Sequence, residues 1–481
     1  MCKCDCRCII ALLGAGALFI LAFTLSRWIE SLWLQGDDAY ITYQYARRLA
    51  AGEGFTFSPG APPTYGSTTP LWTLILALIT RAGIPPHLAA PWLTPVGHGV
   101  TAALVFLLGR RVGGLGVGLL AGALVGGSLP VFFRTGGMEI ALLTALSAAL
   151  ALTLVRDDRN YWPGVLFGLL LLTRPDSVLL VLLILAGWAV RRRDWWRILG
   201  NGAVACAVYL PWALYALATF GDLVPSSIQA KLVPWTPSGA FGLSGFAQAF
   251  LPGPGQLATL CGWILFVGLG AAAVWKRLPA LRPFIVWVPL YCIAMRWGRA
   301  ADFKWYYVPP MWMAQLLLAV GMCYLIARMP RGARVPSGLL LVTVTLLLFG
   351  VHNWKAVAEV REHSPWLTFH KELALRVRAI SKPGDLVASQ EVGNLAYWSQ
   401  RPVLDMLGLT SSAEVRLRAG SHLFGAMFRH WRPDWVVVHG IHDATLSNHY
   451  KPVVQIPYCT GRNYTIWKRL PDVHAEIGPT S

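Results

Sequence analysis

Long apolar runs that alternate with short basic clusters constrain the fold of this 481-residue chain more than any other feature. Apolar residues make up 55% of the chain and charged residues only 13%, whereas soluble proteins carry about 25% charged residues. This balance is typical of an integral membrane protein. The formal net charge is +18, but the cations lie between apolar runs and not along one polar face. The charge therefore indicates membrane topology, and no nucleic-acid partner is expected.

The basic clusters predict the orientation of the chain, because Lys and Arg accumulate in the cytoplasmic loops of membrane proteins. Two apolar segments separate each neighbouring pair of clusters, so every cluster can lie inside. The clusters are Lys3 and Arg7; Arg110 and Arg111; Arg156 and Arg159; Arg191, Arg192, Arg193 and Arg197; Lys276, Arg277 and Arg282; and Arg328, Arg331 and Arg334. About eleven helices follow, at residues 8–28, 87–109, 113–132, 138–155, 160–173, 177–190, 197–219, 256–275, 283–297, 306–327 and 335–352.

An odd number of spans and an inside N-terminus predict two domains. Residues 1–352 form a transmembrane domain whose first outer loop covers 30–86, and residues 353–481 form an extracytoplasmic α/β domain. In that tail "PGDLVASQ", "RPVLDMLGL", "RPDWVVVHG" and "NYTIWKRL" read as short strands between helices. The expected fold class is therefore an α-helical polytopic membrane protein with a C-terminal α/β domain.

Two apolar segments need separate treatment. The run after "MCKCDCRC" resembles a signal peptide, but it lacks a small-residue cleavage pattern and is taken as an uncleaved first helix. The segment "STTPLWTLILALITRAG" has helical length, yet a full span there would move Arg110 and Arg111 outside. We expect it to be a juxtamembrane or re-entrant helix on the outer face, as is tolerated where protein covers its ends.

The predicted outer loops hold most of the unusual polar residues. They are Asp37 and Asp38; Arg134 and Glu139; Arg174 and Asp176; Lys231; and Arg296, Arg299, Asp302 and Lys304. Structural interpretations exist for many of them: Arg174 can form a local ion pair with Asp176, and Glu139 can pair with Arg134. The cations near "WYY" can lie at the membrane interface beside the aromatic rings.

Asp37 and Asp38 are harder to explain structurally. Adjacent like charges repel, and near a low-dielectric boundary one of the two would become protonated unless a cation or a reacting proton compensated it. Ionisable residues beside lipid are costly and usually functional. The pair therefore marks a candidate active site at the outer end of the first helix.

Seven strings carry a resemblance to a known family: "DDAYITYQYARRLAAGEGFTFSPG", "YGSTTPLWTLILAL", "GGMEIALL", "LLTRPD", "QAKL", "KWYYVPP" and "PGDLVASQEVGNLAYWSQRPVLDMLGL". In this order, over residues 31–440, the chain resembles GT-C superfamily glycosyltransferases. It looks most like bacterial arabinofuranosyltransferases that use decaprenyl-phosphate arabinose, and less like lipid A aminoarabinose transferases and protein O-mannosyltransferases. The chain is shorter than the mycobacterial arabinosyl enzymes, and its Cys2, Cys4, Cys6 and Cys8 cluster has no counterpart there.

The resemblance implies an enzyme of the bacterial cytoplasmic membrane. Such enzymes move a sugar from a polyprenyl-phosphate carrier to an extracytoplasmic cell-envelope glycan, lipid or protein, with an acidic residue of the first outer loop as the base. Asp37 would be that base and Asp38 its support. Arabinofuranose is favoured by the resemblance alone.

Chemistry assigns the other candidate residues. A glycosyl phosphate has a good leaving group, so inversion needs a base for the attacking hydroxyl and cations for the departing phosphate. The expected phosphate-binding residues are Lys231, Arg174, Arg299 and Lys304, and the expected acceptor- or sugar-binding residues are Glu139, Tyr40 and Asp176.

No cofactor is expected, and metal-independent transfer is favoured over a divalent cation held by Asp37 and Glu139. The chain has no Walker A motif and no H-E-x-x-H pattern, and His98, inside a span, reads as a core residue. The alternative function is a lipid or sugar transporter or flippase, which would place its charges along a midplane path in repeated halves. A noncatalytic assembly protein would tolerate neutralisation of Asp37.

Overall fold

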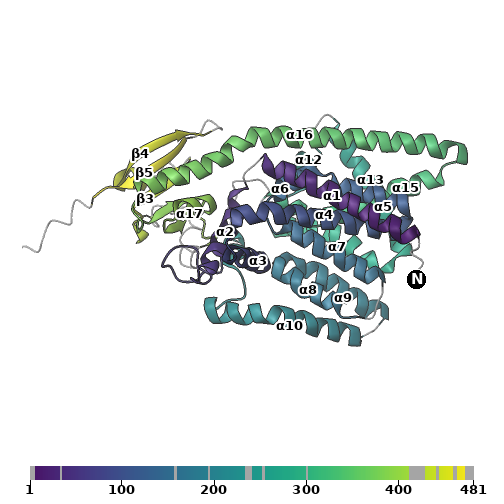
Figure 1. Cartoon of the computed structure of the whole chain (residues 1–481), viewed down its shortest axis with the longest axis horizontal. Helices are drawn as coiled ribbons and strands as arrows, with labels where there is room; N and C mark the ends of the chain where they lie inside the picture. Colours follow the sequence, from purple (N-terminus) through teal and green to yellow (C-terminus); the bar gives the residue numbers. More distant parts are fainter. Residues whose placement is uncertain are drawn as a thin grey trace, which may run out of the picture.

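Helices make up most of the molecule, and a small sheet stands at one end of them (Figure 1). The computed structural model describes residues 6–32, 35–156, 160–192, 195–232, 241–251, 255–298, 302–410, 428, 430–439, 444–458 and 463–471. The start of α1 (Cys6–Ser31) lies at the end of the helix bundle that is farthest from the sheet (Figure 1). This arrangement agrees with an N-terminus and a C-terminal domain on opposite sides of a membrane.

The larger helices occupy every segment that the apolar runs predicted. They are α1 (Cys6–Ser31), α4 (Pro86–Gly113), α5 (Leu115–Gly126), α6 (Leu129–Thr135), α7 (Ile140–Arg156), α8 (Trp162–Thr173), α9 (Val178–Arg192), α10 (Trp195–Phe220), α13 (Gln256–Arg277), α14 (Arg282–Trp297), α15 (Met311–Arg328) and α16 (Arg331–Ile380). Among the described residues, six helices are long and apolar enough to cross a membrane, or up to seven if a bent pair is one span. The chain is a multi-pass membrane protein.

Shorter helices fill the loops and the C-terminal domain. They are α2 (Asp37–Ala50), α3 (Pro70–Arg81), α11 (Ser226–Leu232), α12 (Leu243–Phe250), α17 (Gly393–Ser399), α20 (Ala444–His449) and the 3₁₀ turns η1 (Pro175–Ser177), η2 (Pro279–Leu281) and η3 (Lys304–Tyr307). The α3 helix has 12 residues, about 18 Å of rise, which is too short to cross the ~30 Å core of a bilayer. Its length agrees with the juxtamembrane or re-entrant placement expected for this segment.

The predicted span 113–132 is divided into α5 and α6, which meet at 44°. Gly126, Gly127 and Pro130 fall at or beside the break, and such residues weaken a continuous helix. Asn353 of α16 supplies the missing hydrogen bonds: its Nδ2 donates to the Gly127 oxygen at 2.8 Å, and its Oδ1 accepts from the Leu129 N–H at 3.1 Å. A break in a membrane span is tolerated here because a side chain of a neighbouring helix forms hydrogen bonds with the backbone groups that the break leaves unpaired.

The α16 helix crosses the expected domain boundary without interruption. It has 50 residues, about 75 Å of rise, and runs along the whole bundle to the sheet (Figure 1). Pro336 and Pro365 lie inside it, and each removes one backbone hydrogen bond from the helix. The boundary expected between residues 352 and 353 therefore falls within a continuous helix that links the two parts of the chain.

The C-terminal sheet has the order β2-β1-β3-β5-β4. Its strands are β1 (Val387–Ser389), β2 (Val403–Asp405), β3 (Trp435–His439), β4 (Tyr450–Pro457) and β5 (Asn463–Arg469). The β1 strand pairs in parallel with β2 and β3, and β5 pairs antiparallel with β3 and β4. Strands lie in each of the tail strings read as strands, so the predicted α/β domain is confirmed.

The first outer loop joins the bundle to this sheet through one buried apolar cluster. Tyr45 and Phe55 of the loop region share it with Trp212 of α10, Val377 of α16 and Val387 of β1. The α2, α3 and α17 helices lie at the same junction, between the bundle and the sheet (Figure 1). The predicted active-site loop is thus packed against the C-terminal domain and is not an open surface loop.

Candidate functional site

Asp37 is the first residue of α2, and its carboxylate reaches the start of α17 in the C-terminal domain. Oδ1 accepts hydrogen bonds from the N–H of Asn394 at 2.7 Å and from Asn394 Nδ2 at 3.2 Å, and Oδ2 accepts from the Gly393 N–H at 2.9 Å. These contacts join residues more than 350 positions apart in sequence. Asp37 therefore caps α17 and connects the first outer loop to the C-terminal domain.

Gly393 permits this close approach. A Cβ atom at Gly393 would collide with the backbone oxygen of Asp37 and come within 2.9 Å of the Ile41 nitrogen. The first turn of α17 consequently lies directly against the backbone of α2, closer than any other residue type would allow. The position of the Asp37 carboxylate depends on this glycine.

A second acidic group, Glu391, lies beside Asp37. His370 Nε2 is 2.5 Å from one Glu391 carboxylate oxygen, and the Tyr464 hydroxyl donates to that oxygen at 2.7 Å. Asp37, Glu391, His370 and Tyr464 all border a cavity of about 10 Å³, roughly the room that one water molecule needs. We name these four residues the junction site.

The pKa values of the two carboxylates in the junction site are shifted in opposite directions. Burial, and next the charge of Glu391, raise the pKa of Asp37, although the N–H groups of Asn394 and Gly393 and the charge of His370 oppose the shift. Burial also tends to raise the pKa of Glu391, but its hydrogen bonds to His370 and Tyr464 bring that pKa below its ordinary value. Asp37 is thus the member whose proton affinity is increased, a property common at functional sites.

The neighbours of Asp37 on α2 have different surroundings. Asp38 is half-buried. Tyr40 is 1% exposed, and its ring packs edge-on against Tyr43 and Tyr397, with centroids 5.0 and 5.3 Å apart. A sugar would reach Tyr40 only after this aromatic cluster had moved, so its predicted sugar-binding role stays a prediction.

Glu139 of the second predicted outer loop meets Arg174 and Asp176 of the third in one largely buried network. Arg174 Nη1 lies 2.7 Å from Glu139 Oε1, and Arg174 Nη2 lies 3.0 Å from Asp176 Oδ2. The Tyr291 hydroxyl donates to Asp176 Oδ2 at 3.0 Å. We name Glu139, Arg174, Asp176 and Tyr291 the bundle site.

The bundle site tests two ion pairs that the sequence predicts, Arg174 with Asp176 and Glu139 with Arg134. The local ion pair between Arg174 and Asp176 is present. The pairing of Glu139 with Arg134 is wrong, because Arg134 Nη2 bonds instead to both carboxylate oxygens of Glu359 at 2.7 Å. Glu359 lies on α16, whose continuation past residue 352 places an acceptor beside Arg134. A phosphate at Arg174 would have to compete with two carboxylates.

The predicted phosphate-binding residues are not all described. Lys304 lies 2.5 Å from Asp302, which also accepts a hydrogen bond from the Tyr307 hydroxyl at 2.5 Å. Lys231 is in α11, with its side chain outside the described residues, and Arg299 lies outside them altogether. The α11 helix is tied to the first outer loop, since the Ser226 N–H donates to the Tyr65 oxygen at 2.7 Å.

An apolar groove of about 700 Å³ opens between α12, α13, α14 and α15. Phe246, Trp263 and Tyr307 line it together with Arg296 and Trp297. Trp297 is 85% exposed, as expected of an aromatic residue that faces lipid at a membrane interface. The groove has the size and lining of a site for a hydrocarbon chain.

Side-chain contacts connect the predicted outer loops at the sheet end of the bundle. The Tyr43 hydroxyl of α2 and Trp72 Nε1 of α3 both donate to the Gly137 oxygen at 3.2 Å, two residues before Glu139. The Arg174 guanidinium carbon is 5.5 Å from the ring centroid of Tyr306 in η3. Polar groups from four predicted outer loops are therefore gathered on one side of the molecule.

The structure places the proposed metal ligands apart from one another. Asp37 faces α17, whereas Glu139 is held by Arg174. Within the described residues, no group of three or more His, Cys, Asp or Glu is arranged to hold a metal ion. Metal independence stays a prediction. His98 is a satisfied core residue as expected, with Ser26 Oγ 2.8 Å from Nδ1 and Thr135 Oγ1 3.1 Å from Nε2.

Comparison with solved structures shows the fold. ArnT from Cupriavidus metallidurans bound to undecaprenyl phosphate matches with a TM-score of 0.61 and 14% identity, over 98% of this chain and 99% of that one. The archaeal oligosaccharyltransferase AglB from Archaeoglobus fulgidus, in complex with an inhibitory peptide and a dolichol-phosphate, matches with a TM-score of 0.60 and 12% identity, over 94% of this chain and 74% of that one. The expected GT-C fold is confirmed.

Sequence comparison adds little to this result. The family described as "Domain of unknown function (DUF8728)" matches residues 350–467, which include the end of α16 and the sheet. No curated protein matches the sequence. The chain is thus a multi-pass membrane protein of GT-C fold that carries a C-terminal α/β domain, and its activity has to be argued from its own residues.

Proposed function

We propose that this protein is a glycosyltransferase that moves a sugar from a polyprenyl-phosphate carrier to a hydroxyl of an extracytoplasmic acceptor. The observation that carries the proposal is the junction site, where Asp37 follows the first membrane helix of a GT-C fold. The likeness to ArnT bound to undecaprenyl phosphate, over 98% of the chain, supports a lipid-linked donor. The sugar is arabinofuranose and the acceptor a cell-envelope glycan, lipid or protein in the bacterial cytoplasmic membrane.

Transfer with inversion needs one base and a site for the leaving phosphate. Asp37 takes the proton of the acceptor hydroxyl as its oxygen attacks the anomeric carbon. The bond between that carbon and the phosphate oxygen breaks, and its electron pair leaves with the polyprenyl phosphate. A carboxylate has about four acceptor positions, and three hydrogen bonds already reach Asp37. One position remains for the acceptor hydroxyl. Asp38, the next residue, is assigned a supporting role for the base Asp37.

The apolar groove between α12, α13, α14 and α15 is suited to the donor lipid. Its hydrocarbon lining would hold part of the polyprenyl chain. Arg296 lines the groove, and Lys304 belongs to the same 3₁₀ turn as the lining residue Tyr307, so we assign the phosphate to these two cations. Lys231, Arg174 and Arg299 complete the proposed set of phosphate-binding cations. The basic clusters at the opposite end of the bundle support a cytoplasmic N-terminus and an extracytoplasmic C-terminal domain.

The test is the variant Asp37→Asn, assayed for transfer from a labelled polyprenyl-phosphate sugar. Loss of a general base is expected to lower kcat by about 10²- to 10⁴-fold. An amide also disturbs the cap of α17, so Asn394→Ala serves as the matched control: it removes a hydrogen bond to Asp37 but keeps the carboxylate. The expected result is a large loss in Asp37→Asn and a smaller one in Asn394→Ala.

Normal turnover by folded Asp37→Asn would refute the assignment of the base, and equal losses in both variants would reduce Asp37 to a structural cap. A panel of polyprenyl-phosphate pentoses and hexoses tests the sugar. The transporter alternative is tested with labelled donor in sealed vesicles, where it requires movement of the lipid across the bilayer without an acceptor.

A further inference from the structure

Basic side chains from three helices surround the last turn of α17. Lys371 Nζ of α16 lies 4.4 Å from the ring centroid of Trp398, and the ring centroid of His87 in α4 lies 4.9 Å from that of Trp398. The guanidinium carbon of Arg47 in α2 lies 4.6 Å from the ring centroid of the neighbouring Tyr397. We name Arg47, His87 and Lys371 the basic cluster.

The members of the basic cluster act on one another, and their printed contacts are with neutral groups. The charges of Lys371 and Arg47 both act on His87. Arg47 Nη1 donates to the Tyr397 oxygen at 2.8 Å, and its Nη2 donates to Gln44 Oε1 at 2.6 Å. Two cations are therefore held near the same histidine.

The carboxylates that are nearest in sequence do not compensate these cations. Glu53 pairs with Arg48, and Glu372 is exposed, about 100° around α16 from Lys371. Within the described residues, no Asp or Glu forms an ion pair with a member of the basic cluster. Cations that are close together without a paired carboxylate favour an anionic ligand.

The basic cluster also offers hydrogen-bond donors suited to a phosphate. The ammonium group of Lys371 carries three N–H donors. His87 Nδ1 lies 2.7 Å from the Tyr397 hydroxyl, and with that hydroxyl as the donor the imidazole proton is on Nε2, where it can be donated to an anion. His87 is the second residue of α4, a helix of 28 residues, and the first turn of a helix carries a positive partial charge.

The side chains of α4 below the basic cluster indicate its level in the membrane. Leu88 and Trp92 are exposed, as expected of residues that face lipid. The Arg27 guanidinium carbon lies 4.4 Å from the ring centroid of Trp92, and such pairs are typical of a membrane interface. His87 lies about 7.5 Å of helix rise beyond Trp92, toward the sheet. The basic cluster is therefore at the level of the lipid head groups.

We propose that the basic cluster binds the phosphate of an anionic glycerophospholipid in the leaflet on the sheet side of the bundle. The acyl chains would lie along the exposed apolar side chains of α3 and α4, which include Leu78, Leu88 and Trp92. This apolar surface favours a lipid over a soluble anion. Lysine binds phosphate as a point charge, and a choline head group would bring a second cation that Lys371 repels. The proposal does not depend on sugar transfer.

The experiment measures the lipid that the full chain retains. Wild-type protein is transferred from bilayers of phosphatidylcholine and phosphatidylglycerol into detergent, and bound lipid is counted by native mass spectrometry. We expect phosphatidylglycerol to be retained in preference to phosphatidylcholine. Lys371→Gln should bind it about fivefold more weakly and Lys371→Glu about 25-fold more weakly, from about fivefold per unit of charge. Arg376→Gln removes an exposed cation of the same helix and should leave retention unchanged.

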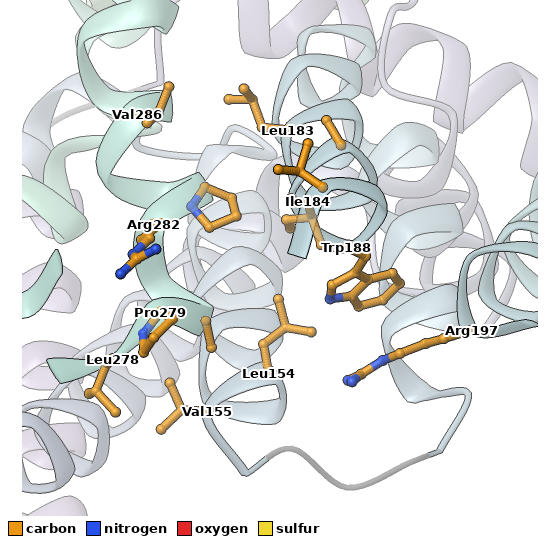
Figure 2. Close-up of a pocket in the computed structure, with 15 residues that line it drawn as sticks. Leu154, Val155, Leu183, Ile184, Trp188, Arg197, Leu278, Pro279, Arg282 and Val286 are labelled. Carbon is orange, nitrogen blue, oxygen red and sulfur yellow. The ribbon is translucent and has the colours of Figure 1, made fainter. Parts of the chain in front are cut away.

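Another apolar surface has to be distinguished from the basic cluster. A hollow of about 540 Å³ lies between α7, α9, α10 and α14 (Figure 2), at the end of the bundle away from the sheet (Figure 1). Leu183 and Ile184 face Leu278 and Val286 across it (Figure 2). Ala186→Leu narrows this hollow without changing its charge. Phosphatidylglycerol bound at the basic cluster should be retained by this variant as by wild type.

Four results would overturn the proposal. Lys371→Glu could retain phosphatidylglycerol as wild type does, or wild type could retain both lipids equally. Loss of retention in Ala186→Leu would assign the lipid to the hollow. Displacement by inorganic phosphate or by polyprenyl phosphate at equal concentration would assign the basic cluster to a soluble anion or to the sugar carrier. Thermal unfolding near that of wild type shows that each variant is folded.

Discussion

The junction site and the bundle site contain the same kinds of group but use them differently. In the bundle site, Glu139 and Asp176 both contact Arg174, so opposite charges satisfy one another. In the junction site, the donors that reach Asp37 from the described residues are uncharged: the N–H groups of Gly393 and Asn394 and the Asn394 amide. A carboxylate held by neutral groups has no hydrogen-bonded cation that opposes its protonation, and burial raises the pKa of Asp37. We therefore expect proton transfer at the junction site, and we expect Arg174 of the bundle site to stabilise the fold in addition to the phosphate contact proposed for it.

Removing the cation of the bundle site should have the largest effect on stability. Arg174→Met leaves the buried Glu139 and the half-buried Asp176 without their guanidinium and is expected to lower the free energy of unfolding by about 3–5 kcal/mol. Thermal unfolding of the purified protein in detergent measures this change. Arg328→Met, at an exposed position, is the control and should change stability by no more than about 0.5 kcal/mol.

A different result for Arg174→Met would change the role assigned to the bundle site. If Arg174→Met unfolded like wild type but raised KM for the polyprenyl-phosphate sugar, Arg174 would be a phosphate-binding residue and the bundle site part of the catalytic apparatus. Glu139 and Asp176 would then position a cation for the substrate.

Separating the two backbones at the junction should have a smaller effect. Gly393→Ala places a Cβ against Asp37 and Ile41, and forcing α17 away is expected to cost about 1–3 kcal/mol and to lower activity. Hydrogen exchange at the N–H groups of Gly393 and Asn394 should become faster, because their acceptor is displaced. Gly384→Ala, in the same domain with open space around its Cβ position, should change neither exchange nor activity. Unchanged exchange in Gly393→Ala would mean that the contact does not persist in the membrane.

The sequence predicts those features of the fold that depend on local patterns. Apolar runs placed the membrane helices, and the basic clusters predicted a C-terminal domain at the far end of the bundle from the N-terminus. The resemblance drew attention to Asp37, and the string "QEVGNLAYWSQ" within it contains Glu391, Gly393 and Asn394, which were not selected as site residues. No spacing rule relates them to Asp37, because their contact depends on the way the sheet packs against the first outer loop.

Charged pairs were the least predictable feature. Glu139 was paired with Arg134 because the two lie close in sequence, but three-dimensional packing brings Arg174 to Glu139 and Glu359 to Arg134. The second pairing depends on the length of α16, which the sequence divided at residue 352 because its polarity changes there. Helix continuity, not composition, determined which carboxylate Arg134 could reach.

The smallest expected effect tests the proton affinity of Asp37 directly. As a base Asp37 acts only when ionised, and burial raises its pKa above that of an ordinary aspartate. Activity should therefore fall on acidification at a higher pH than an ordinary aspartate would give. Glu391→Gln removes a negative charge that contributes to the raised pKa, while Gln can still accept a hydrogen bond from Tyr464. The acidic limb of the kcat/KM profile should therefore move to lower pH by about one unit or less.

Glu372→Gln, an exposed change on α16, controls for a general change in charge and should leave the profile in place. A merely structural role for Glu391 would lower activity at every pH without moving the limb. A limb that moves only when Asp38 is replaced would identify Asp38 as the titrating base, and Asp37 would then serve only as the cap of α17. The pH profile thus distinguishes the two acids that the sequence places side by side.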